Sequence, residues 1–121
     1  MKARTTGDKA QGRVGAGAGE FEPLLNLLSL GVRGGNVILG VDGIRSALQN
    51  GEVVCVVIAS DVSKRAMEKV ARLAIGKEIP LLAGPDAATL GDRLGRPPVQ
   101  AVGVRDRALA GGVLRAARPW T

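Results

Sequence analysis

Few residues in this chain could carry covalent chemistry, and Asp61 is the most conspicuous of them. It follows the apolar run at residues 53–59, and an aspartate at the end of a buried strand can accept a phosphoryl group or hold Mg²⁺. Such a site also needs acidic residues near the end of an earlier strand, and residues 37–40 (Val-Ile-Leu-Gly) supply none. We therefore predict that Asp61 caps a helix.

The residues required by most other catalytic centres are missing. The chain has no histidine, which excludes a Ser-His or Cys-His nucleophile and a histidine-based metal site. Its single cysteine, Cys55, lies inside an apolar run, so we expect a buried, inert thiol. Neither the phosphate-binding GxxxxGK[ST] sequence nor the dinucleotide glycine spacing is present. We predict that the protein is not an enzyme and uses no metal or cofactor.

The segment that follows Gly40 has the features of an anion-binding helix. Residues 41–49 carry apolar side chains at helical spacing, with polar ones on the opposite face. Gly40 lets the backbone turn tightly out of a preceding strand, so the first amides of the helix lack intrahelical acceptors. A helix N-terminus of this kind suits phosphate.

Strand and helix patterns alternate along the rest of the chain. Apolar or β-branched runs predict strands at residues 37–39, 53–59, 78–82 and 99–104, of which the second should be central in the sheet. Helical patterns lie at residues 22–30, 41–49, 64–74, 84–94 and 106–114. We expect Gly31, Gly34 and Gly35 to end the first helix, and the charges at residues 64–72 to form a solvated face. The order predicts an α/β fold, a three-layer α-β-α sandwich around a sheet of about four strands.

Length and charge limit the domain organisation and the kind of partner. The 121 residues fit one domain, placed at residues 21–121 after a disordered, basic, glycine-rich tail at residues 1–20. The formal net charge of +6 favours an anionic partner, nucleic acid first, although scattered arginines can also serve solubility alone. No apolar run is long enough to span a membrane and no signal peptide is present, so we expect a cytoplasmic protein.

The segment from residue 31 to residue 63 resembles a known family. Gly40 opens a helix, Gly51 closes it, and a Val/Ile-rich strand then ends in Ala-Ser-Asp at residues 59–61. This order is similar to that of the ribosomal-type kink-turn RNA-binding family, particularly its small bacterial YlxQ-like members. The leucine-rich residues 24–30, the Leu-Gly-x-x-Leu-Gly segment at residues 90–95 and the later strands follow in the same order, so the resemblance covers residues 21–117.

The resemblance implies an RNA site made by three loops at one edge of the sandwich, at residues 35–43, 60–63 and 95–101. In the family, the first loop contacts the sheared G·A pairs of a kink-turn, and the last forms an apolar ledge under a base turned out of the helix. The family commonly has Asn or Lys, Glu or Gln, and Lys where this chain has Asp42, Gly43 and Ser46. The predicted RNA-binding residues are Arg33, Gly35, Asn36, Gly40, Val41, Asp42, Gly43, Arg45, Ser46, Arg96, Pro97, Pro98 and Val99.

The leading hypothesis is therefore a non-enzymatic, monomeric protein that binds structured RNA, either a kink-turn or a bent loop, in the ribosome or elsewhere. Proteins recognise A-form RNA mainly where the helix bends or its bases splay out, because the deep major groove hides the sequence. One alternative is a protein-interaction module that has kept the fold and lost the RNA contacts. Another, resting only on the α/β architecture, is a small-molecule or nucleotide-binding enzyme.

Overall fold

The computed structural model describes residues 19–120, and the predicted tail is therefore described only at Gly19 and Glu20, which are helical. The other predicted tail residues, 1–18, lie outside the described part of the chain. The elements are, in chain order, α2 (Glu22–Gly34), β1 (Val37–Leu39), α3 (Val41–Gln49), β2 (Cys55–Ile58), α4 (Lys64–Gly76), β3 (Leu81–Ala83), α5 (Ala87–Arg93), β4 (Ala101–Val104), α6 (Arg107–Ala116) and β5 (Arg118–Pro119).

The strands form one mixed sheet in the order β1-β4-β2-β3-β5. Only β2 and β3 pair in parallel, and the other neighbours are antiparallel. The prediction that the second strand is central is confirmed. In the described part of the chain the sheet has five strands where about four were expected. The addition is β5, which pairs with the edge of β3 over only two residues and leaves no periodic pattern in the sequence.

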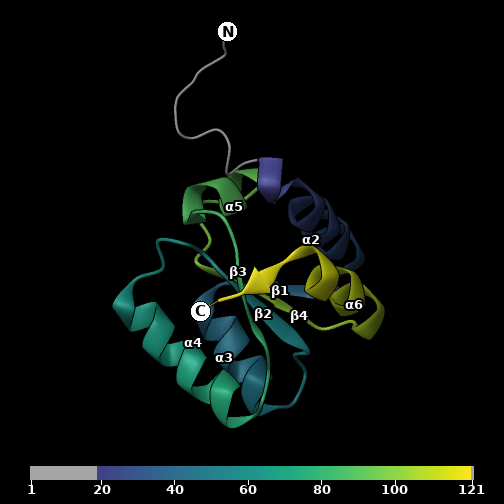
Figure 1. Ribbon diagram of the computed structural model, residues 1–121. Helices are drawn as coiled ribbons and strands as arrows, with labels where there is room; N and C mark the ends of the chain where they lie inside the picture. The colour runs from purple at the N-terminus through teal and green to yellow at the C-terminus, as the bar shows by residue number, and fades with distance from the viewer. Residues whose placement is uncertain (1–18, 121) are drawn as a thin grey trace, which may run out of the picture.

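Helices cover both faces of this sheet, which confirms the predicted three-layer sandwich (Figure 1). One core lies between the sheet and helices α3 and α4, and the other lies between the sheet and helices α2, α5 and α6. Strand β2 contributes side chains to both cores. Val56 and Ile58 lie in the core under α3 and α4, and Cys55 and Val57 lie in the core under α2, α5 and α6. All four side chains are fully buried, which explains the unbroken apolar run.

The first helix is longer than predicted because Gly31 is a packing residue inside α2. A β-carbon built on Gly31 would lie 2.6 Å from Cγ1 of Val37 and 2.7 Å from Cδ2 of Leu109. The missing side chain therefore lets α2 approach β1 and α6 closely. The helix ends at Gly35, one of the three glycines predicted to end it, whose φ of 71° is in the left-handed region that favours glycine.

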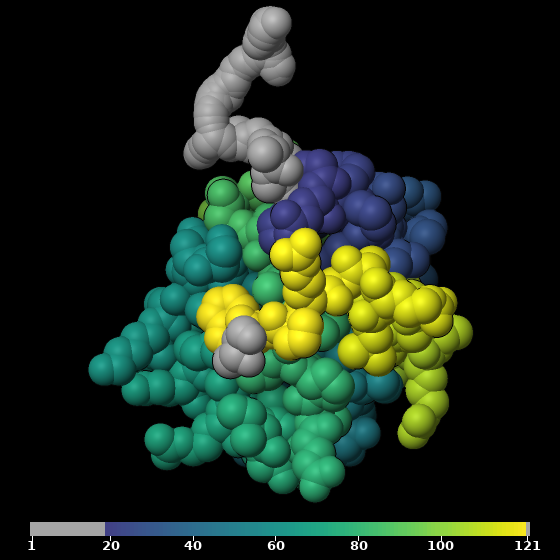
Figure 2. Space-filling view, in the orientation of Figure 1, coloured from purple at the N-terminus to yellow at the C-terminus, as the bar shows by residue number. Residues whose placement is uncertain are grey.

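The chain ends beside the sheet. In Figure 2 the C-terminal segment, in yellow, crosses the visible face between the teal residues of the α3 and α4 layer and the purple residues of α2. The backbone N–H of Trp120 donates to the carbonyl oxygen of Leu81 at 2.9 Å, and the Trp120 side chain packs against the core under α3 and α4. This contact joins the terminus to the same layer that carries the candidate site.

Candidate functional site

The sheet topology brings three chain segments together at one end of the strands. Strands β1 and β2 both run antiparallel to β4, with Leu39 opposite Val102 and Ile58 opposite Ala101. The residues that follow β1 and β2 must therefore lie beside those that precede β4.

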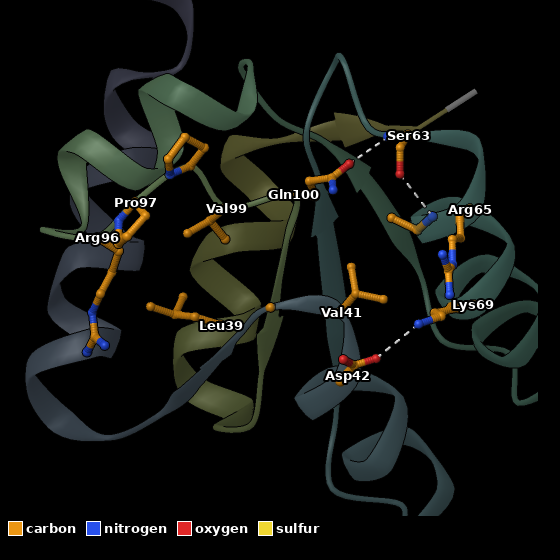
Figure 3. Close-up of a pocket in the computed structure, with 13 residues that line it drawn as sticks. Leu39, Val41, Asp42, Ser63, Arg65, Lys69, Arg96, Pro97, Val99 and Gln100 are labelled. Atoms are coloured by element: carbon orange, nitrogen blue, oxygen red, sulfur yellow. Dashed lines mark hydrogen bonds and ion pairs between the residues drawn. The ribbon is translucent and has the colours of Figure 1, made fainter.

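A hollow of about 480 Å³ opens where these segments meet. Figure 3 shows Arg96 and Pro97 on one side and Arg65 and Lys69 on the other, with apolar side chains between them. Its lining residues are Leu39, Gly40, Val41, Asp42, Ser63, Arg65, Ala66, Lys69, Arg96, Pro97, Pro98, Val99 and Gln100.

Hydrogen bonds hold the segments around the hollow in a fixed relation. The backbone N–H of Gly40 donates to the carbonyl oxygen of Ala101 at 3.2 Å. The backbone N–H of Ser63 donates to Oε1 of Gln100 at 2.6 Å, and the hydroxyl of Ser63 accepts from the N–H of Ala66 at 3.1 Å (Figure 3). Ser63 thus caps α4 and also ties the start of that helix to the segment before β4.

Helix α3 begins at the hollow without a side-chain cap. Its N-cap residue is Gly40, with φ 97° and ψ 151°, a conformation that strongly favours glycine. Helices α4, α5 and α6, in contrast, are capped by the side chains of Ser63, Asp86 and Asp106. A β-carbon at Gly40 would meet no atom within 4 Å, so the space beside this turn is open. The first amides of α3 can therefore donate to a ligand.

An apolar ledge borders the hollow on the side of α5. Pro97, Pro98 and Val99 form this ledge, and the N–H of Val99 donates to the carbonyl oxygen of Ala87 at 3.0 Å. A β-carbon built on Gly91 of α5 would overlap the carbonyl oxygen of Pro97, so only glycine allows this approach of loop and helix. The ledge is thus supported by the backbone of α5.

The charges around the hollow are mixed. Nζ of Lys69 lies 3.3 Å from Oδ1 of Asp42, with side chains 37% and 89% exposed, respectively. An ion pair this exposed is weak and is screened by salt. No ion pair within the described residues involves Arg65 or Arg96. The hollow therefore keeps two cations available for an anionic ligand.

Asp61, the strongest catalytic candidate, has a structural role. Its Oδ1 accepts a hydrogen bond from the backbone N–H of Ala87 at 2.8 Å. The prediction that Asp61 caps a helix is confirmed, but the helix is α5, which follows β3, and the adjacent α4 is capped by Ser63. This contact spans 26 residues along the chain, so the local sequence could not show it.

Residues 23–110 match the family described as ribosomal protein L7Ae/L30e/S12e/Gadd45. The chain belongs to this family. A protein of unknown function from Bacillus halodurans C has a TM-score of 0.72 with this chain at 25% identity, covering 77% of this chain and 94% of that protein. The Giardia lamblia 15.5kD RNA binding protein has a TM-score of 0.67 at 20% identity, covering 81% and 84%, which establishes similarity of fold alone. No curated protein matches the chain.

Seven of the thirteen predicted site residues line the hollow of this family member: Gly40, Val41, Asp42, Arg96, Pro97, Pro98 and Val99. The other α3 residues lie beyond it. Gly43 and Ser46 are exposed without lining the hollow, and Arg45 lines a neighbouring groove between α3 and α4.

The structure corrects the predicted first loop at residues 35–43, because β1 divides it. Gly35 and Asn36 precede β1 and line a separate hollow with Arg105, and Arg33 lies in the last turn of α2. Three strand residues separate Asn36 from Gly40, a distance of about 13 Å along the strand. A ligand bound beside Gly40 would reach these residues only by extending along β1.

Six residues of the hollow were not predicted as site residues: Leu39, Ser63, Arg65, Ala66, Lys69 and Gln100. The charges of residues 64–72 were assigned to a solvated face, and Arg65 is exposed as expected. One signal in the sequence could have pointed to Arg65. Ser63 is a helix-capping residue type, and a residue two positions after a cap lies in the first turn of the helix. The approach of that turn to Gln100 depends on the sheet topology, which periodicity does not show; only the resemblance placed residues 60–63 and 95–101 at one edge.

No helix between residues 19 and 120 combines the length and the apolar character needed to cross a membrane.

Proposed function

We propose that this chain is a non-enzymatic RNA-binding protein that holds a kink-turn, or an RNA bent in a similar way, at the hollow beside Gly40. One observation carries the proposal: the uncapped start of α3 faces the same hollow as an apolar ledge and two available cations. Membership of the family and the fold of the Giardia lamblia RNA binding protein support it.

Each feature of the hollow has a counterpart in a bent RNA. The amides at the start of α3 can donate to phosphate or base-edge oxygens exposed by the bend. The ledge of Pro97, Pro98 and Val99 offers an apolar surface to a base turned out of the stack. Arg65 and Arg96, on opposite sides, can hold the backbone as it passes through.

The proposal also covers the oligomeric state, the cellular location and the RNA partner of the protein. The protein acts as a monomer in the cytoplasm, resembles the YlxQ-like members of the family, and associates with the ribosome or another structured RNA. Co-sedimentation of the tagged protein with ribosomal particles in a sucrose gradient tests this setting. Tagged protein that stays at the top of the gradient at low salt would remove the ribosomal part of the proposal.

Fluorescence anisotropy with a labelled kink-turn RNA tests the proposed function. The competitor is an uninterrupted duplex of the same length, and the protein is first washed at high salt and treated with nuclease. We expect the kink-turn to bind more tightly, and Arg96→Gln to weaken it. Arg115→Gln, on α6 across the sheet, removes the same charge away from the hollow and should bind as the unchanged protein does. Equal affinity for both RNAs would contradict specificity for bent RNA.

A second function is a protein-interaction module on the same fold. Asp42 places a carboxylate in the first turn of α3, and Gly43 and Ser46 provide no long polar side chain on the exposed face of the helix. These residues reduce the polar contacts available to RNA. Failure of the nuclease-treated protein to bind either RNA, at low salt and micromolar concentration, would favour this function.

A further inference from the structure

A basic groove runs between α3 and α4 and continues from the hollow. Its volume is about 870 Å³, and Arg65 and Lys69 line both the groove and the hollow. The groove is lined by Arg45, Gln49, Arg65, Glu68, Lys69, Arg72, Leu73, Gly76 and Lys77.

Helical spacing sets the cations of this groove in a row. Arg65, Lys69 and Arg72 are separated by four and three residues on α4, so they lie on one face over about 10 Å. Arg45 and Gln49, four residues apart on α3, form the opposite wall.

The groove carries an excess of positive charge that the described residues do not neutralise. Five of its lining residues are cationic and one, Glu68, is acidic. Within residues 19–120, only Lys69 among these cations takes part in an ion pair, with exposed Asp42. Like charges four residues apart on a helix, such as Arg65 and Lys69, destabilise it. A cost of this kind is expected where function requires it.

We propose that this groove binds the phosphates of the RNA stem that leaves the hollow, so that the protein holds one flanking stem as well as the bend. The inference rests on the proposed function and extends the same site. A duplex backbone presents several charges over 10 Å, which matches the length of the row on α4.

The lining favours a phosphate backbone over bases. No aromatic residue lines the groove, so it offers no surface on which a base could stack, and Leu73 is its one large apolar residue. Arginine and lysine on exposed helices suit phosphate contacts, which are independent of sequence. We therefore expect the groove to add affinity without adding sequence preference.

The test compares two kink-turn RNAs that share the same bend, one with long flanking stems and one with both stems cut short. Affinities for both are measured by fluorescence anisotropy at several salt concentrations. Arg45→Gln and Arg72→Gln change residues that line only the groove, and Arg96→Gln changes one that lines only the hollow. Arg115→Gln on α6 is the matched control for lost charge.

We expect each groove variant to lower the affinity for the long-stemmed RNA by at least about threefold at low salt, and to reduce the salt slope by about one. Affinity for the short RNA should change much less. Glu68→Gln should strengthen binding of the long RNA, because it removes the groove's acidic residue. Arg96→Gln should weaken both RNAs alike. Thermal melting of each variant should match that of the unchanged protein.

Two results would overturn the inference, and they can be told apart. If Arg96→Gln weakens binding while both groove variants bind the long RNA as the unchanged protein does, the hollow binds RNA and the groove serves another anion, such as an acidic protein. If the unchanged protein binds neither RNA, the proposed function fails and the inference fails with it.

Discussion

Asp42 sets the charge at the centre of the proposed site. Its carboxylate lies in the first turn of α3, where it interacts favourably with the helix dipole, and it pairs with Lys69 at 3.3 Å. The carboxylate opposes phosphate binding in two ways. It repels the phosphate directly, and it pairs with Lys69, which could otherwise bind the phosphate. We therefore expect Asp42 to limit the affinity of the proposed site for RNA.

We predict that Asp42→Asn strengthens binding of a kink-turn RNA by about threefold to tenfold, equivalent to about 0.7 to 1.4 kcal/mol. The free energy of unfolding should fall by less than about 1 kcal/mol, since the lost dipole and ion-pair interactions are exposed. Anisotropy and urea titration measure the two effects. Glu52→Gln, beside Arg105 in the separate hollow, is the control. Unchanged or weaker binding by Asp42→Asn would show that the carboxylate does not oppose RNA.

The buried thiol of Cys55 should make the stability of the folded protein depend on pH. Its burial in β2 raises the pKa of the thiol to about 11. The folded protein therefore holds the thiol proton more tightly than the unfolded chain, so stability is fully present below the thiol's ordinary pKa and declines between about 9 and 11. Urea titrations across this range should show the decline, and Cys55→Ala, which is less stable throughout, should lack this component. Rapid labelling of the native thiol at pH 8 would contradict the burial.

At the scale of elements, the loop that carries the ledge depends on a glycine in α5. Gly91 lies against the carbonyl oxygen of Pro97, and its own carbonyl oxygen accepts from the N–H of Arg96 at 2.8 Å. A methyl group at this position must push the loop and helix apart.

We predict that Gly91→Ala destabilises the protein by about 1 to 3 kcal/mol, as overpacking does, and weakens RNA binding. Gly111→Ala is the matched control, because Gly111 is also helical and lies on α6, away from the hollow and the groove. A β-carbon there meets only Nη1 of Arg115, at an ordinary contact distance of 3.7 Å. Thermal melting and anisotropy at a temperature where both variants are folded separate the two effects. If Gly91→Ala melts and binds as Gly111→Ala does, the close approach has no functional role.

The elements that sequence predicted well are those with a local signal. Helix α3 was predicted at its observed bounds because glycines flank an amphipathic segment. Of the three glycines predicted to end α2, Gly34 and Gly35 do lie at its end, and Gly31 lies inside it, since the same residue type both ends helices and allows close packing. Strand β5 was missed because its two residues are defined only by pairing with β3.

The candidate site likewise contains residues that the sequence could predict and residues that it could not. Gly40 could be predicted from turn chemistry, and the ledge of Pro97, Pro98 and Val99 from the resemblance to the family. Arg65 and Lys69 could not, because their place in the hollow depends on β2 running antiparallel to β4. Long-range pairing of this kind is a property of the topology, which periodicity within one segment does not reveal.

At the scale of the whole molecule, the net charge of +6 predicts salt-sensitive binding. If about four phosphates are neutralised, log affinity should fall against log salt with a slope of about −3 to −4. Anisotropy between about 50 and 200 mM salt measures this slope. A slope near zero would contradict an interaction with a phosphate backbone.

The central claim is that RNA binds at the end of the sheet where α3 begins, and backbone amide chemical shifts test it most directly. ¹⁵N-labelled protein is titrated with a kink-turn RNA, and the amide shifts are followed along the chain. We predict the largest changes at residues 40–43, at Arg65 and at Val99, with little change at Asn36 and Arg105. Changes centred on Asn36 and Arg105 instead, or no changes at all, would contradict the claim.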